Sequence, residues 1–189
     1  MKDTALYLEN TLTGKKEEFS PRSGNTVKLF TCGPSVYKHQ HIGNYRTFLY
    51  EDVLFRYLKL MGYQVKRLIN FTDIEDKALE EAKRRNISID ELCGPVVEEF
   101  YKDCESLRII LPEPIPRSSD SVTEAAKLIS ILMDKGIAYR YEKDIFFDPL
   151  KYDGFGQLFG LDMKKWPEKK VRFKKDTYNG NRWNRGDFI

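Results

Sequence analysis

The sequence predicts an α/β protein, and three stretches carry this prediction. Residues 26–31 (Thr-Val-Lys-Leu-Phe-Thr) are mostly β-branched, aliphatic or aromatic and predict a strand. Residues 45–61 place apolar side chains at helical spacing and predict a helix that stops at Gly62. Residues 63–69 alternate in polarity and predict a second strand. Strand, helix and strand in this order form a right-handed βαβ unit, so both parallel strands end at one edge of the sheet.

The turn that follows the first strand, beginning at Cys32, is the candidate site. An α/β sheet binds ligands at the carboxyl ends of its strands, where N–H groups of a helix N-terminus face an anion. Gly33 and Gly43 allow close approach of the backbone to a ligand, and His41 is either a phosphate donor or an ordinary surface histidine. Cys32 suits a thiolate metal ligand or a core position. By topology, residues 70–73 lie beside Cys32.

Composition limits the class of protein. The 189 residues suit one domain or slightly more, with 41% hydrophobic and 32% charged residues. A net charge of +3 permits contact with RNA without arguing for it. No apolar run approaches membrane-spanning length and the N-terminus lacks a signal-peptide core, so we expect no membrane partner. Three cysteines without framework spacing predict reduced thiols and a cytoplasmic location.

Helices are predicted after the second strand. Thr72 and Glu75 match a capping box for a helix over residues 73–85. A second capping box, Ser88 with Glu91, begins another helix, which is delayed or kinked by the Gly-Pro pair at residues 94–95.

Residues 111–120, with three prolines in alternate positions, predict an extended linker and a subdomain boundary. A helix over residues 122–135 and a β-hairpin over residues 137–148 follow. The helix is expected to bury Ala125, Leu128, Ile129 and Leu132. Residues 164–175 are basic with interleaved aromatics, a pattern that suits RNA, but we favour a solvated loop.

The candidate site resembles a known signature. Cys-Gly-Pro-Ser-Val-Tyr at residues 32–37 and His-Ile-Gly-Asn at residues 41–44 resemble the signature of cysteinyl-tRNA synthetases, which are class I aminoacyl-tRNA synthetases. The class motif is His-x-Gly-His, and the cysteine enzymes use His or Asn at its last position, here Asn44. Ser35 stands where Thr is usual. Further resemblance to the family lies in residues 8–16, 70–77, 135–148 and 186–189.

This resemblance implies a fold and a division of the chain. The fold would be the first half of a Rossmann-type parallel-sheet nucleotide-binding domain with an inserted α+β connective subdomain. Residues 1–111 would form the first Rossmann half, and residues 112–189 the inserted subdomain and the start of the second half. Arg117 matches an arginine seen near the start of the insertion, although it also suits a solvated linker. The apolar end at residues 186–189 would enter a buried strand, so we expect the N-terminal part of a longer enzyme.

The resemblance also implies an activity, cysteine–tRNA ligation. Cysteine would be activated with ATP to cysteinyl-adenylate and transferred to tRNA(Cys), with His41 and Asn44 as catalytic residues. The substrate cysteine would contact Cys32, Gly33 and Thr72. A zinc ion would bind the substrate thiolate and discriminate against serine, with Cys32 as one ligand. The ATP contacts would be Pro34, Ser35, Tyr37, His41, Ile42, Gly43 and Asn44.

The implied machinery is incomplete in this sequence. The family's other zinc ligands (a Cys, a His and a Glu) and its Lys-Met-Ser-Lys-Ser-type loop lie beyond residue 189. We therefore expect little aminoacylation activity and weak or no zinc binding from the isolated chain, unless a second polypeptide completes the site. The alternatives are a truncated paralogue that binds ATP or RNA without catalysis, and a mycothiol-type cysteine ligase. The intact segment at residues 70–77 and the long basic insertion favour the tRNA enzyme.

Overall fold

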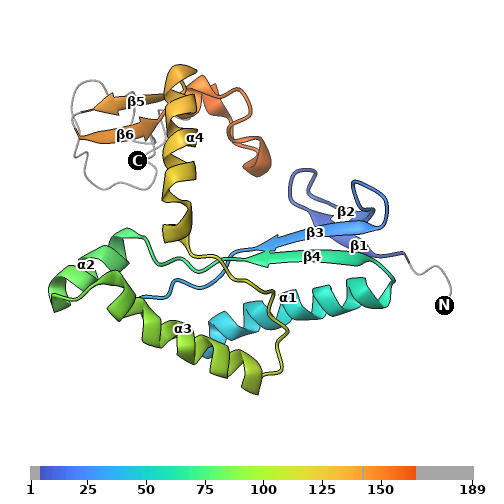
Figure 1. Cartoon of the computed structure of the whole chain (residues 1–189). Coiled ribbons are helices and arrows are strands. Elements are labelled where there is room, and N and C mark those ends of the chain that lie inside the picture. Colours follow the sequence, from blue (N-terminus) through green and yellow to red (C-terminus); the bar gives the residue numbers. More distant parts are fainter. Residues whose placement is uncertain (1–4, 142, 165–189) are drawn as a thin grey trace. The chain divides into compact units, whose positions relative to one another are not determined.

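The computed structural model describes residues 5–141 and 143–164 (Figure 1). The chain forms two compact units, one of which is Ser20–Val122. The other combines Met1–Phe19 with Thr123–Ile189. All residues of the candidate site belong to the first unit.

A parallel βαβ arrangement is the centre of the first unit. Strands β3 (Thr26–Thr31) and β4 (Gln64–Ile69) pair in parallel along their whole lengths. Helix α1 (Ile42–Leu60) connects them and lies along one face of the sheet (Figure 1). The helix ends before Gly62, whose φ of +89° is readily adopted only by glycine. The predicted α/β class, both strands and the helix stop are thereby confirmed.

Helix α1 begins earlier than the sequence pattern indicates. We predicted a start at residue 45, whereas the first helical residue is Ile42. His41 is the N-cap, and it forms a reciprocal capping box with Asn44. Because histidine is an uncommon N-cap, the apolar periodicity alone misplaced this helix start.

Helix α2 (Asp76–Arg85) corrects the predicted capping box at Thr72. The segment before it stays extended, because the Thr72 N–H donates to the Pro34 carbonyl at 3.0 Å and the Asp73 carboxylate accepts from Ser119. These contacts with distant segments outcompete a local cap.

Helix α3 (Ile89–Ser106) is continuous. It begins with the predicted capping box of Ser88 and Glu91 and runs through Pro95. We expected the Gly-Pro pair to delay or kink this helix, and the delay was wrong because the helix begins at Ile89.

The core is an aromatic cluster around Phe100 of α3. Its ring makes edge-on contacts with Phe48 of α1 at 5.2 Å and with Phe71 at 5.5 Å between centroids. Tyr45 stacks on the same ring at 6.0 Å. Phe71 lies two residues after the end of β4, so this cluster joins α1, α3 and the strand end that borders the candidate site. The Tyr45 hydroxyl donates to Asp103 at 2.6 Å, and burial raises the pKa of that hydroxyl.

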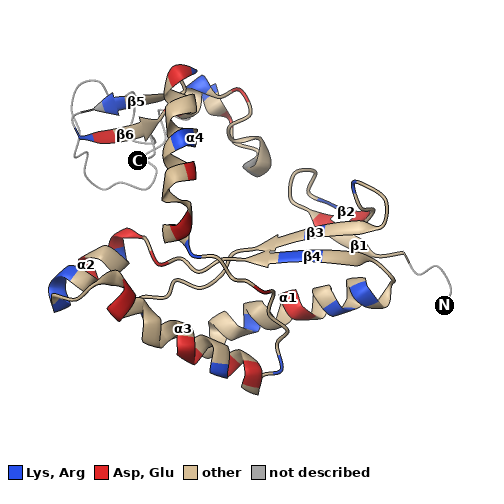
Figure 2. Ribbon diagram, viewed as in Figure 1, with Lys and Arg blue, Asp and Glu red and all other residues tan. Residues whose placement is uncertain are grey.

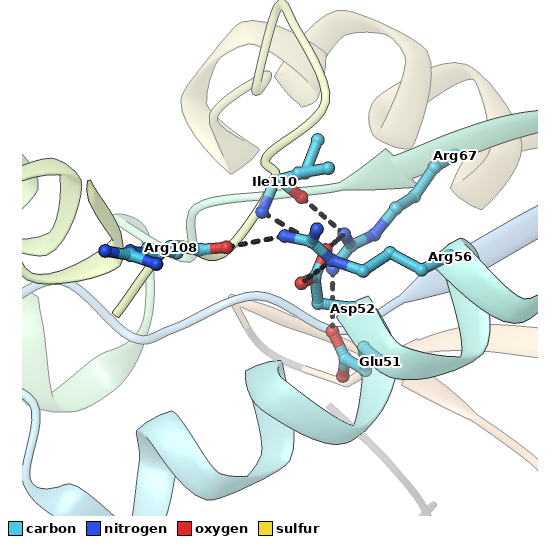
Figure 3. A network of polar contacts seen from close by, with 6 residues as sticks. All are labelled: Glu51, Asp52, Arg56, Arg67, Arg108 and Ile110. Carbon is cyan, nitrogen blue, oxygen red and sulfur yellow. Dashed lines mark hydrogen bonds and ion pairs between the residues drawn. The ribbon is translucent and has the colours of Figure 1, made fainter. Parts of the chain in front are cut away.

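A buried ionic network fixes the chain after α3 (Figure 3). The Arg67 side chain is 3% exposed and lies 3.6 Å from Glu51 and 3.7 Å from Asp52. It also donates to the Ile110 carbonyl at 2.6 Å, while the Ile110 N–H donates to Asp52 at 3.1 Å. Arg56 adds a bond to Asp52 at 2.7 Å. The network therefore ties α1 and β4 to the chain segment that follows α3.

The predicted linker is bound to the first unit. The Phe71 N–H donates to the Pro116 carbonyl, and the Ser118 N–H donates to the Phe71 carbonyl, both at 2.9 Å. Ile115 is buried, and Arg117 forms an ion pair with Asp90 at 3.0 Å. Residues 112–122 thus cluster with residues 20–111, and the short 3-10 helix η1 (Ser118–Ser121) ends this segment.

In its described residues, the second unit contains two hairpins, one α-helix and two short 3-10 helices, η2 (Pro149–Lys151) and η3 (Gln157–Phe159). Strands β1 (Tyr7–Asn10) and β2 (Lys15–Glu18) pair antiparallel, as do β5 (Ala138–Tyr141) and β6 (Asp144–Phe147). The latter pair confirms the predicted hairpin.

Helix α4 (Val122–Asp134) precedes β5 and corrects an expectation. Of its predicted core positions, Ala125, Leu128 and Ile129 are exposed and Leu132 is half-buried. The apolar spacing predicted the helix correctly, but no described residue covers that face.

Two sequence predictions, the basic loop beyond residue 164 and the strand start at residues 186–189, lie outside the described residues. Among the described helices, none has the length and apolar character needed to cross a membrane.

Candidate active site

A pocket of about 340 Å³ opens where β3 ends and α1 begins. It contains seven of the predicted site residues. The start of α2 contributes two more lining residues, its N-cap Glu75 and Lys77 in its first turn. The lining residues are Cys32, Gly33, Pro34, Ser35, Tyr37, Lys38, Gln40, His41, Asn44, Thr47, Phe48, Glu75 and Lys77. The turn predicted to bind a ligand therefore does form a cavity.

The two strand ends meet beside this pocket, as the βαβ topology predicted. The backbones are so close that a Cβ atom at Gly33 would lie 1.6 Å from the Asn70 carbonyl oxygen. Thr72 extends the parallel pairing, because its N–H donates to Pro34 and its carbonyl accepts from Val36 at 3.1 Å. Gly33 is therefore required by backbone packing, whatever it contributes to a ligand.

His41 and Asn44 are oriented by the helix cap that they form. The Gly43 N–H donates to His41 Nδ1 and the His41 N–H donates to Asn44 Oδ1, both at 3.1 Å. Because Nδ1 accepts this bond, the ring proton of neutral His41 is on Nε2. Asn44 likewise uses its oxygen in the cap, which leaves its amide nitrogen as the donor. The cap thus gives the pocket two uncharged hydrogen-bond donors.

Three predicted residues contribute to the site without lining it. A Cβ atom at Gly43 would lie 2.9 Å from His41 Cε1, so glycine permits the bond from its N–H to the ring. Ile42 is 77% exposed and contributes its helical backbone. The Thr72 hydroxyl accepts from Asn70 Nδ2 at 3.3 Å, and its backbone supports the loop that begins at Pro34.

Sequence reasoning missed five polar lining residues: Lys38, Gln40, Thr47, Glu75 and Lys77. Gln40 closes the loop through bonds from Nε2 to the carbonyls of Ser35 at 2.8 Å and Lys38 at 3.0 Å. Helical spacing could have revealed Thr47, which follows Asn44 by three positions and shares its face of α1. The sequence pattern that includes Glu75 was interpreted as a helix capping box and not as part of a pocket.

The charges around the pocket suit an anionic ligand that also carries a cationic group. Among the described lining residues, Lys38 and Lys77 are the cations and Glu75 is the one carboxylate. The first turn of α1 contains no acidic residue, so the positive end of its dipole retains its attraction for an anion. Elsewhere acidic and basic positions are interspersed along α1, whereas the charged positions of α3 are acidic except for Lys102 (Figure 2). Neither helix therefore carries the concentration of basic residues that typically binds RNA.

The described residues do not build a complete metal site. Cys32 is exposed in the pocket, and no group of three or more His, Cys, Asp or Glu side chains within residues 5–141 and 143–164 is arranged to hold an ion. The other two cysteines are buried, and burial raises the pKa of the Cys93 thiol and that of Cys104, to about 12. A zinc site normally needs three or four protein ligands, of which these residues offer Cys32.

Comparisons with known proteins indicate the same family as the sequence motifs that form this pocket. Residues 18–189 match the family described as tRNA synthetases class I (C) catalytic domain. The cysteine–tRNA ligases of Chlamydia muridarum and Chlamydia abortus are 36% and 38% identical to the chain over 185 residues. These alignments cover 97% of this chain and 38% of each relative, so the chain spans less than half the length of these ligases. The resemblance noted at residues 32–37 and 41–44 is thus confirmed, and the chain belongs to the family of class I (C) tRNA synthetase catalytic domains.

Proposed function

We propose that this chain supplies the ATP- and cysteine-binding wall of a cysteine–tRNA ligase. In the first step, a carboxylate oxygen of cysteine attacks the α-phosphorus of ATP, and pyrophosphate leaves with the electrons of the broken P–O bond. In the second step, a ribose hydroxyl of tRNA(Cys) attacks the carbonyl carbon of the adenylate and AMP leaves. The observation that carries this proposal is the pocket whose donors are oriented by the cap of His41 and Asn44.

The first step needs positioning and charge stabilisation more than proton transfer. The attacking carboxylate is already ionised, so a general base has no proton to remove. Negative charge on the phosphate oxygens is stabilised by His41 Nε2–H, the Asn44 amide and the positive end of the α1 dipole. These donors are held by the helix cap before ATP binds, so little reorganisation is needed.

The amino acid end of the site is assigned to Cys32, Gly33 and Thr72, at the meeting point of the two strand ends. Pro34, Ser35 and Tyr37 continue this wall toward the nucleotide. A zinc ion that binds the substrate thiolate is part of the proposal. Cys32 would be one of its ligands, and the others come from outside these residues, in the same polypeptide or a second one.

We also assign residues 1–111 to the first half of a Rossmann-type domain and residues 112–189 to the inserted connective subdomain with the start of the second half. The parallel β3–β4 pair supports the first assignment, and the α4–β5–β6 segment supports the second. The partners of the whole ligase would be tRNA(Cys), ATP and cysteine, in the cytoplasm, where free cysteines stay reduced.

Asn44→Asp tests this function because it alters the side-chain hydrogen-bond donor at residue 44 while keeping the oxygen that forms the helix cap. Aspartate retains the oxygen that accepts from the His41 N–H, but it replaces the amide donor with a negative charge. We expect thermal stability to change little, while the affinity for ATP, measured by calorimetric titration, falls by about tenfold or more.

The control is Asn86→Asp, the same chemical change at the left-handed C-cap of α2, where φ is 55°. Asn86 does not line the pocket, so this variant should bind ATP like the wild type. Equal ATP affinity of wild type, Asn44→Asp and Asn86→Asp would contradict the proposed function, as would an absence of binding to the wild type.

A further inference from the structure

Glu75 is the one acidic side chain among the described residues that line the pocket, and no described residue uses its side-chain carboxylate in a hydrogen bond or ion pair. Glu75 is the N-cap residue of α2, but its side chain makes no capping hydrogen bond. The predicted capping box would have used this carboxylate to bind the Thr72 N–H, which instead donates to Pro34. Glu75, which the sequence predicted to be a capping residue, therefore lines the pocket and does not cap the helix through its side chain.

One oxygen of this carboxylate is both shielded and unsatisfied. Glu75 Oε1 is buried from solvent and has no hydrogen-bond partner among the described residues. An unsatisfied polar group away from water costs free energy, so a buried oxygen of this kind calls for a donor that the described residues do not supply. Lys38 and Lys77 line the same pocket, yet neither is within ion-pair distance of Glu75 in the described structure.

We propose that Glu75 binds the α-ammonium group of the amino acid substrate. This inference rests on the proposed function, which brings ATP, cysteine and the end of a tRNA to the site. ATP and tRNA carry negative charge, so a carboxylate repels their phosphates. The α-ammonium group is the cation among these reactants, and it is the best donor for a shielded carboxylate oxygen. Lys77 carries a positive charge, which suits the carboxylate or the phosphates of the same reactants.

A magnesium ion bound to ATP is the rival occupant for this oxygen. Magnesium usually keeps several of its waters and is held through carboxylates together with phosphates. A single carboxylate with a solvent-shielded oxygen leaves little room for that water shell, which favours the ammonium group. The experiment therefore omits magnesium from its main comparison.

The test compares two stable adenylate analogues, cysteinyl sulfamoyl adenosine and mercaptopropionyl sulfamoyl adenosine, which lacks the amino group. Both are titrated calorimetrically at about pH 7 without magnesium, using the 189-residue chain. We expect wild type to bind the amino form at least about tenfold more tightly. Glu75→Gln keeps the size of the side chain but removes its charge, and it should abolish most of that preference. Glu75→Asp keeps the charge and should retain part of it.

Glu80→Gln is the matched control, because it makes the same charge change at an exposed position of α2 outside the pocket lining. It should leave the preference unchanged. If wild type binds both analogues and Glu75→Gln leaves their ratio intact, the role of Glu75 is overturned while the proposed function stands. A loss confined to binding of magnesium–ATP would overturn it in favour of the metal. If wild type binds neither analogue, both proposals are overturned.

Discussion

Three cysteines of this chain lie in two very different environments. Cys32 is exposed at the end of β3, whereas Cys93 and Cys104 are buried on α3 within the aromatic core. Burial disfavours a thiolate, and it raises the pKa of Cys93 and the pKa of Cys104, the latter to about 12. Since the thiolate is the reactive form, only Cys32 combines access with reactivity.

Native thiol counting with Ellman's reagent at about pH 8 should therefore detect one fast thiol per chain. Unfolding in urea should expose all three cysteines. Cys32→Ser should remove the fast phase, and ATP, which has no thiol of its own, should slow it in the wild type because Cys32 lines the pocket. A second fast thiol in the native chain would contradict the buried positions of Cys93 and Cys104.

At the scale of elements, local periodicity predicted those parts of the fold that depend on local sequence. Strands β3 and β4, the body of α1 and the capping box of Ser88 and Glu91 follow from spacing within a short window. The start of α2 does not, because Thr72 and Asp73 bind Pro34 and Ser119, which are distant in sequence. No pattern within one window contains those partners.

The same limit explains which parts of the site were predictable. His41, Asn44 and Cys32 lie in one continuous segment whose motif carries them into the pocket together. Glu75 and Lys77 reach the pocket only because β4 returns parallel to β3 and its following segment stays extended. The positions of Glu75 and Lys77 near the pocket could be inferred from topology. Their roles could not, because they depend on the absence of a side-chain cap on α2, which only the structure shows.

The network around Arg67 is the element-scale feature with the clearest energetic consequence (Figure 3). Arg67→Met would leave Asp52 and Glu51 in a buried region without this cation and would remove the donor to the Ile110 carbonyl. We expect the free energy of unfolding in urea to fall by about 3–5 kcal/mol.

Arg67→Lys should lose less stability, since it keeps the charge but not the forked geometry. Lys66→Met is the matched control, because Lys66 is the preceding residue of β4 and is exposed. It should cost less than about 1 kcal/mol. If Arg67→Met and Lys66→Met destabilise the chain equally, the network does not stabilise the segment after α3.

At the scale of the whole molecule, the site is one-sided. Every described lining residue of the pocket comes from Cys32–Phe48 or from Glu75 and Lys77, all within the first compact unit. The related ligases are longer than this chain, which covers 38% of each. Under the proposed function, the rest of the chemistry would come from residues outside this pocket lining.

The zinc content of the isolated chain is the sharpest test of the proposal that the remaining zinc ligands come from other residues. All three cysteines and both histidines lie in the described residues, where they form no metal-binding group with Asp or Glu. A single thiolate holds zinc weakly compared with the three or four ligands of a stable site.

We therefore expect elemental analysis of the chain, purified without chelator, to find well below one zinc per chain, and any bound zinc to be lost to a mild chelator. Cys32→Ser should remove the residual zinc, whereas Cys93→Ser should not. One tightly held zinc per chain would mean that Cys32 has partners within these 189 residues, and the proposal that the remaining ligands come from elsewhere would be wrong.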